Sequence, residues 1–183
     1  MGRSMKRAAT AAALAGLPFM LSLPAAAGPD AASLAGVYKH LQPPSTENGV
    51  TSRDEDILEI VPYEGARDKA YFRLFIRFAN YHSCDATGIA RTTPTGLRYE
   101  AKVDGMACSL KMDFTPKGLA IQDHDDLCRT AFCGARGVLN WTSPIRRSDR
   151  RPIRYGKRIL ESDQYEKAVE IEKAAPVGKT PAP

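Results

Sequence analysis

The residues with the clearest chemical potential lie at 128–141, a stretch that reads CRTAFCGARGVLNW. A disulfide between Cys128 and Cys133, which have four residues between them, would fix a small loop, and the glycines on both sides of Arg136 would let its backbone approach another surface closely. We therefore predict that Arg136, Gly134 and Gly137 form a binding contact in which the guanidinium meets a carboxylate. The alternative is a buried structural arginine that ties the loop to a strand carboxylate.

Two other clusters carry groups that could do chemistry. The run 123–126, Asp-His-Asp-Asp, offers oxygen ligands for a cation, although a polar turn between strands is the favoured interpretation. His82 and Cys84 are two residues apart and could act as a base and a thiol nucleophile. The sequence contains no Gly-x-Ser-x-Gly, His-Glu-x-x-His or phosphate-loop motif. We predict a protein that is not an enzyme, without cofactor or metal site, and keep an enzyme of unknown type as an alternative.

The cysteine count predicts two disulfides in an exported chain. The four cysteines are Cys84, Cys108, Cys128 and Cys133. An even number in an oxidising compartment favours full pairing, and four cysteines allow three connectivities. We favour Cys128 with Cys133, which leaves Cys84 with Cys108. If one strand separates the strands of that second pair, their Cα atoms lie about 9 to 10 Å apart, whereas a disulfide needs less than about 7 Å. A four-cysteine zinc site is the alternative.

Residues 1–27 have the features of an export signal. Arg3, Lys6 and Arg7 precede an uncharged apolar run at 8–23, and small residues at 25–27 fit a cleavage site after Ala27. The apolar run has about 16 residues, fewer than the roughly 20 that a membrane-spanning helix needs. We predict a periplasmic or secreted protein with no transmembrane segment after cleavage.

Composition divides the rest of the chain at residue 143. The predicted signal holds three of the 26 basic residues and none of the 21 acidic ones, which leaves a net charge of +2. We expect a disulfide-bonded domain at 28–143, and a basic linker, a short helix at 159–175 and a disordered tail within 144–183. The basic run could make a weak contact with an anionic envelope surface. The alternative is that it forms a solvated extension without a partner. The arginines of this contact are Arg146, Arg147, Arg150, Arg151 and Arg154.

Short alternating segments predict an all-β fold. The clearest is 70–78, AYFRLFIRF, in which Phe72, Leu74 and Ile76 share one face. Residues 42–54 are rich in loop formers and predict a long mobile loop. Eight strands joined by tight turns predict an antiparallel meander that closes into a small lipocalin-like barrel, with a β-sandwich as the alternative. The predicted strands are 34–41, 57–61, 70–78, 83–91, 97–103, 108–114, 119–122 and 137–142.

A set of motifs along 34–146 resembles a group of small exported proteobacterial proteins. The motifs are Cys84 with Gly88-Ile89-Ala90, Leu97 and Tyr99, Cys108-Ser109-Leu110, Cys128, and the CGARG run that begins at Cys133. Some members of that group are described as lysozyme-inhibitor-like, and the resemblance implies a lipocalin-like barrel. Periplasmic inhibitors of C-type lysozyme are similar in size and export, but their Ser-Gly-x-x-Tyr loop does not occur here. No residue role is transferred from that motif.

These observations favour three functions of different classes. The first is a protein-binding module of the cell envelope that acts through the loop of Arg136, for example on a cell-wall hydrolase such as lysozyme. The second is a barrel interior that binds a small apolar ligand or lipid, since eight strands can just enclose one small molecule. The third is the enzyme of unknown type. The small net charge and its uneven distribution argue against nucleic acid as a partner.

Overall fold

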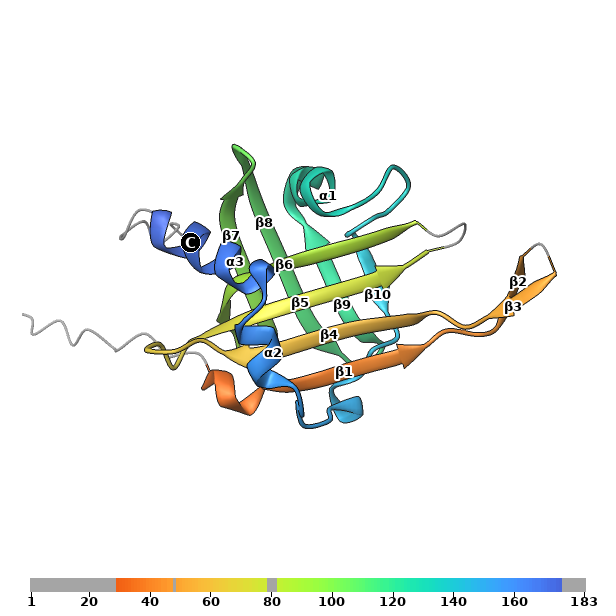
Figure 1. Cartoon of the computed structure of the whole chain (residues 1–183), viewed down its shortest axis with the longest axis horizontal. Helices are drawn as coiled ribbons and strands as arrows, with labels where there is room; N and C mark the ends of the chain where they lie inside the picture. The colour runs from red at the N-terminus through yellow and green to blue at the C-terminus, as the bar shows by residue number, and fades with distance from the viewer. Residues whose placement is uncertain (1–28, 48, 79–81, 176–183) are drawn as a thin grey trace, which may run out of the picture.

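The computed structural model describes residues 29–47, 49–78 and 82–175, which fold around one eight-stranded antiparallel sheet that curves nearly into a barrel (Figure 1). The predicted fold class is therefore confirmed. In spatial order the strands are β1 (Gly36–Leu41), β4 (Glu55–Pro62), β5 (Lys69–Arg77), β6 (Ser83–Thr92), β7 (Gly96–Val103), β8 (Met106–Thr115), β9 (Gly118–Asp123) and β10 (Trp141–Ser143). The helices are α1 (Leu127–Phe132), α2 (Gly156–Leu160) and α3 (Asp163–Ala174), and short 3-10 turns occur at Ala31–Ser33, His124–Asp126 and Arg147–Asp149.

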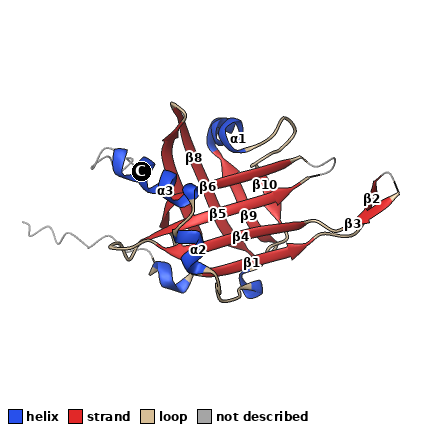
Figure 2. Ribbon diagram, viewed as in Figure 1, coloured by secondary structure: helices blue, strands red, loops and turns tan. Residues whose placement is uncertain are grey.

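The alternating pattern of β5 places its apolar residues inside the barrel. Phe72, Leu74 and Ile76 are fully buried and face the core, as the two-residue period predicts. Figure 2 shows the four strands β1 and β4–β6 crossing the four strands β7–β10 at a steep angle. Side chains from both groups meet between them, including a T-shaped contact of Phe72 with Tyr99 at a centroid distance of 5.3 Å. The core is continuous between the two groups of strands.

Strands β6 and β7 separate soon after they begin to pair. Their paired residues are only Arg91 with Arg98 and Thr92 with Leu97. The interior ring of Tyr99 lies over Gly88 in β6, where an added Cβ would come within 2.2 Å of the ring. The short helix α1 packs against both β6 and β8, and its Phe132 contacts the ring of Tyr99. Thus α1 and aromatic side chains fill the region where the two strands diverge.

Both disulfides anchor α1, and the favoured pairing was wrong. Cys84 in β6 is bonded to Cys133, and Cys108 in β8 is bonded to Cys128. Cys128 belongs to α1, and Cys133 directly follows the helix. Five residues of helix advance about 7.5 Å and turn about 140°, so these two side chains point to different strands rather than to each other. The described residues contain no free cysteine.

The seam between the two edge strands is closed by residues 144–155, which we call the strap. Backbone bonds of 2.8 Å run in both directions between Val37 in β1 and Arg151 in the strap. The buried carboxylate of Asp56 in β4 accepts a hydrogen bond from the Ser143 hydroxyl at 3.1 Å, which joins β4 to β10. Ile145 is fully buried. The boundary we drew at residue 143 therefore marks a change in composition, while packing continues past it.

The C-terminal helices cover one end of the outer face of the sheet. Ile159 and Ala168 are buried there against Val61, Tyr71 and Ile89. The predicted helix at 159–175 is divided in two, because the Ser162 hydroxyl accepts the N–H of Tyr165 and starts α3 anew. Burial raises the pKa of Tyr71 to about 12, as expected for a phenol held under this cover.

The structure differs from the sequence predictions in three local segments. The predicted loop at 42–54 contains a hairpin of β2 (Ser45–Glu47) and β3 (Val50–Ser52), joined by a hydroxyl hydrogen bond of 2.9 Å between Thr46 and Thr51. Helix α1 was not predicted. The strand predicted at 137–142 is confined to β10, because a loop anchored by the fully buried Leu139 occupies its first part.

Two predicted segments lie outside the described residues. These are the export signal at 1–27 and the end of the tail at 176–183. Within the described ranges, no helix has the length and apolar character to cross a bilayer. Two disulfides indicate an oxidising, extracytoplasmic environment.

The two disulfides differ in the length of chain that they close. Replacing Cys84 and Cys133 by alanine is expected to lower the free energy of unfolding by about 4 kcal/mol, and replacing Cys108 and Cys128 by about 3 kcal/mol. The larger loss follows from a separation of 49 residues against 20. Urea unfolding of both double variants measures this. Peptide mapping under non-reducing conditions is the control, and a linked 128–133 peptide would contradict the observed pairing.

Candidate functional site

The segment 134–140, which we call the Arg136 loop, is fixed at its base. The preceding Cys133 is bonded to Cys84, and the N–H of Gly134 donates to the carbonyl of Ser83 at 3.0 Å. The N–H of Gly137 donates to the carbonyl of Gly134 at 3.0 Å, which closes a tight turn around the two residues between them. A disulfide, a strand contact and an internal turn therefore hold the loop.

The two glycines of the loop have different surroundings. Gly137 is buried against the disulfide, and an added Cβ would lie 2.7 Å from Sγ of Cys84 and 2.8 Å from Cβ of Cys133. Gly134 is exposed, and its nearest neighbour to such a Cβ would be an oxygen of Ser83 at 3.8 Å. Only Gly137 is required by close packing.

Arg136 is exposed at the turn of this loop. No hydrogen bond or ion pair joins its side chain to the residues that the structure describes. The alternative of a buried arginine tied to a strand carboxylate is therefore wrong. The guanidinium is presented to solvent from a fixed backbone, an arrangement suited to a bidentate contact with an external carboxylate.

Two aromatic side chains near the loop were missed by the sequence analysis. Trp141, at the start of β10, is 43% exposed, and its ring meets Phe78 in a T-shaped contact with centroids 6.1 Å apart. Val138 in the loop is 41% exposed. Tryptophan and arginine are the residues most enriched at the energetic centres of protein interfaces. Trp141 is the single tryptophan of the chain and ends the stretch 128–141, which was the available signal.

The acidic run at 123–126 supports α1. The carboxylate of Asp123 accepts the N–H groups of Cys128 at 3.0 Å and Arg129 at 2.7 Å, which have no partner within the helix. Asn140 donates to Asp126 at 2.8 Å and accepts the N–H of Asp123 at 2.9 Å. No cluster of three or more potential metal ligands occurs in the described ranges. Within this run, Asp123 caps the first N–H groups of the helix, and Asp123 and Asp126 tie the helix to the Arg136 loop through Asn140.

Two other hypotheses are affected by the structure. A nucleophilic thiol at Cys84 is wrong, because this sulfur is bonded to Cys133. An interior ligand site lacks support, because large side chains fill the barrel. Those of the lowest exposure include Tyr38, Phe72, Leu97, Tyr99, Leu110 and Met112.

The basic residues of the strap lie on its surface. Arg146, Arg147 and Arg154 are exposed, and none forms an ion pair with a carboxylate of the described chain. Arg150 and Arg151 are exposed as well, but the Arg150 guanidinium donates to the carbonyl of Ser33 at 2.8 Å. The backbone pairing of Arg151 with Val37 fixes the positions of these positive charges relative to the barrel.

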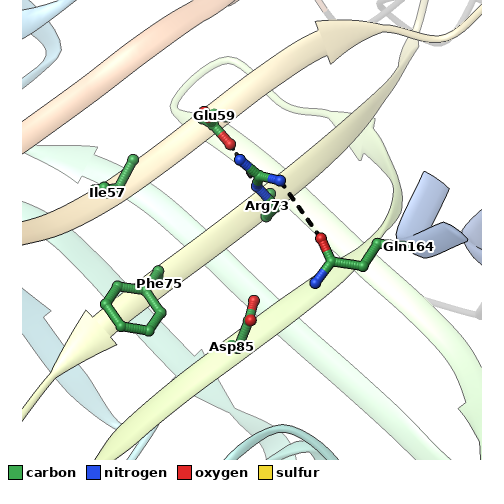
Figure 3. Close-up of a pocket in the computed structure, with 6 residues that line it drawn as sticks. All are labelled: Ile57, Glu59, Arg73, Phe75, Asp85 and Gln164. Atoms are coloured by element: carbon green, nitrogen blue, oxygen red, sulfur yellow. Dashed lines mark hydrogen bonds and ion pairs between the residues drawn. The ribbon is translucent and has the colours of Figure 1, made fainter. Parts of the chain in front are cut away.

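A hollow of about 200 Å³ opens on the outer face of the sheet beside the start of α3 (Figure 3). Its lining residues are Ile57, Glu59, Arg73, Phe75, Asp85 and Gln164. They come from β4, β5, β6 and α3, so this site could not be assembled from local sequence.

Gly137→Ala is expected to lower the free energy of unfolding by about 1 to 3 kcal/mol, because the new methyl group must displace the disulfide. Gly134→Ala is the matched control, and its change should stay within about 0.5 kcal/mol. Urea unfolding under oxidising conditions measures both. Equal effects of the two substitutions would contradict the difference in packing.

No family model, no curated protein and no solved structure matches this chain. The resemblance to lysozyme-inhibitor-like proteins therefore stays a prediction.

Proposed function

We propose that the protein is a protein-binding module of the cell envelope that acts by binding rather than by catalysis, with the Arg136 loop as its contact surface. The observation that carries the proposal is an exposed arginine without a partner among the described residues, on a loop fixed by a disulfide. A fixed loop loses little conformational entropy on binding, so more of the contact energy appears as affinity. The oxidised cysteines and the predicted export signal support a periplasmic or secreted location.

A cell-wall hydrolase such as lysozyme fits this surface by its chemistry. Glycoside hydrolases place two carboxylates beside the bond that they cleave, so their clefts offer the group that a guanidinium binds best. Trp141 and Val138 would add apolar area beside the charged contact. The proposed action is blockage of the cleft by Arg136.

Arg136→Ala is expected to weaken inhibition of a panel of lysozymes and cell-wall glycosidases about 30-fold, the effect of losing a contact of about 2 kcal/mol. Trp141→Ala should reduce inhibition in the same direction. The control is Arg98→Ala, which removes an exposed arginine whose side chain already pairs with Glu100 at 2.8 Å. Enzyme assays with the mature, oxidised protein measure these effects. Absence of inhibition across the panel, or an unchanged Arg136→Ala variant, would reject the hydrolase proposal.

A second candidate function is contact with an anionic envelope surface through the strap. Its supporting observation is the pairing of Arg151 with Val37, which holds several unneutralised arginines against the barrel. Basic residues near an anionic bilayer contribute about 1 kcal/mol each, and this attraction weakens with salt. Anionic lipid is therefore the partner that we propose for the strap.

The triple variant Arg146→Gln, Arg147→Gln and Arg154→Gln is expected to bind vesicles of phosphatidylglycerol and phosphatidylcholine about 100-fold more weakly than the unmodified protein. The control replaces Arg67, Arg91 and Arg98 by glutamine, which removes the same net charge from arginines paired with Asp30, Asp68 and Glu100. Vesicle sedimentation at low and high salt measures binding. Equal losses in both triple variants would show that net charge, and not the strap, governs it.

A further inference from the structure

The hollow in Figure 3 lies on the outer face of the sheet, next to the part of that face that α2 and α3 cover. The register of β4, β5 and β6 places Val61, Tyr71 and Ile89 side by side under the C-terminal helices. Four residues away on each strand, and on the same face, Phe75 of β5 pairs with Ile57 of β4 and with Asp85 of β6. Figure 3 shows these three side chains around the hollow, with Gln164 of α3 at its margin.

One wall of the hollow is an ion pair whose charges are already balanced. The side chain of Glu59 is only 3% exposed, and Arg73 donates to it through Nε at 2.5 Å. The hydroxyl of Tyr155 also donates to Glu59, and burial, followed by this hydrogen bond, raises the pKa of Tyr155 to about 12. Arg73 further donates through Nη1 to Gln164 at 3.4 Å. The guanidinium of Arg73 is therefore bound on two sides.

Asp85 supplies a carboxylate that lacks such a partner. No hydrogen bond or ion pair joins its side chain to the residues that the structure describes, and no dashed line reaches it in Figure 3. The residue is exposed at the rim, yet burial of its carboxyl group raises its pKa, an effect that the nearby Arg73 partly offsets. Glu59, Arg73 and Asp85 together carry one net negative charge. The nearby Arg77 does not cancel it, because Arg77 forms an ion pair of 3.7 Å with Asp54.

The floor of the hollow is apolar and already accommodates a cation. Ile57 and Phe75 are half-buried, and the guanidinium of Arg77 lies 5.3 Å from the ring centroid of Phe75. Aromatic faces attract cations within about 6 Å of the ring centroid. An apolar floor next to one unbalanced carboxylate is suited to a cation on an apolar stem.

We propose that this hollow binds an ammonium or guanidinium group on an apolar stem, with Asp85 as the counter-ion and with Ile57 and Phe75 against the stem. A volume of about 200 Å³ is below the roughly 300 Å³ at which pockets for drug-sized ligands begin, so it fits a group the size of one side chain. Such a group occurs in small amines and in the lysine or arginine side chains of polypeptides. The site does not involve Arg136 and stands apart from the proposed function.

The test is a titration of the mature, oxidised protein followed by NMR chemical shifts. Phenethylammonium is expected to bind at least 10-fold more tightly than phenethyl alcohol, which has the same stem without charge, and phenylacetate should not bind. N-acetylarginine amide and its neutral citrulline analogue form the second arm. If phenethylammonium binds more tightly than N-acetylarginine amide, the ligand is assigned as a free amine. If N-acetylarginine amide binds more tightly, the ligand is assigned as an arginine or lysine side chain of a polypeptide.

Asp85→Asn is expected to lower the affinity for the cation at least 10-fold, whereas Glu100→Gln, an exposed carboxylate on β7, should leave it unchanged. Because protonation removes the charge of Asp85, the affinity should also fall as the pH is lowered through its raised pKa. Equal binding of the amine and the alcohol, or an unchanged Asp85→Asn variant, would overturn the proposal. Shifts confined to residues outside β4, β5, β6 and α3 would overturn it as well.

Discussion

The covalent attachment of α1 to two separate strands is the constraint on which the rest of the structure depends. Strands β6 and β7 pair over a short length and then diverge, so their backbone hydrogen bonds cannot hold the two groups of strands together. Helix α1 replaces that contact with one disulfide to Cys84 in β6 and another to Cys108 in β8. The Arg136 loop begins directly after Cys133, so the disulfide to Cys84 also fixes the base of this loop. The link between the two groups of strands at α1 and the presentation of the candidate contact therefore have one physical cause.

The strands could be predicted because their signal is local. In β5 the alternation of apolar and polar residues records which side chains face the core, and the turns between strands carry their own residue preferences. The pairing of the cysteines could not be predicted, because it depends on a helix of six residues, too short for a helical period to be recognised. The residue that caps this helix, Asp123, was assigned to a polar turn. The contribution of its carboxylate is visible only once Cys128 and Arg129 are placed above it.

The candidate sites show the same division between local and tertiary information. The flanking glycines and nearby cysteines of Arg136 are adjacent in sequence and predicted a presented contact, but they left a buried position open as the alternative. The contact of Trp141 with Phe78 and the hollow at Asp85 join separate strands, so no window of the sequence contains them. The strap was interpreted as a linker because its side chains are basic. The strap is attached to Val37 through backbone N–H and C=O groups. Every residue except proline has both groups, so the amino-acid composition cannot reveal this pairing.

Because side chains fill the interior of the barrel, a ligand must bind on the outer surface. The candidate binding surfaces there differ in the sign of their unpaired charges. Elsewhere on the sheet, several charged side chains are already paired, as with Lys39 and Glu55 or Arg91 and Asp68. A partner that binds such a pair must first break an existing contact, whereas an unneutralised charge gains attraction without that cost. Arg136 and the arginines of the strap are positive and exposed, so salt screens them strongly and they favour acidic partners. Asp85 is negative and lies beside an apolar floor, where the lower local dielectric strengthens each contact. The two kinds of surface therefore select ligands of opposite charge, and a ligand that suits one is repelled by the other.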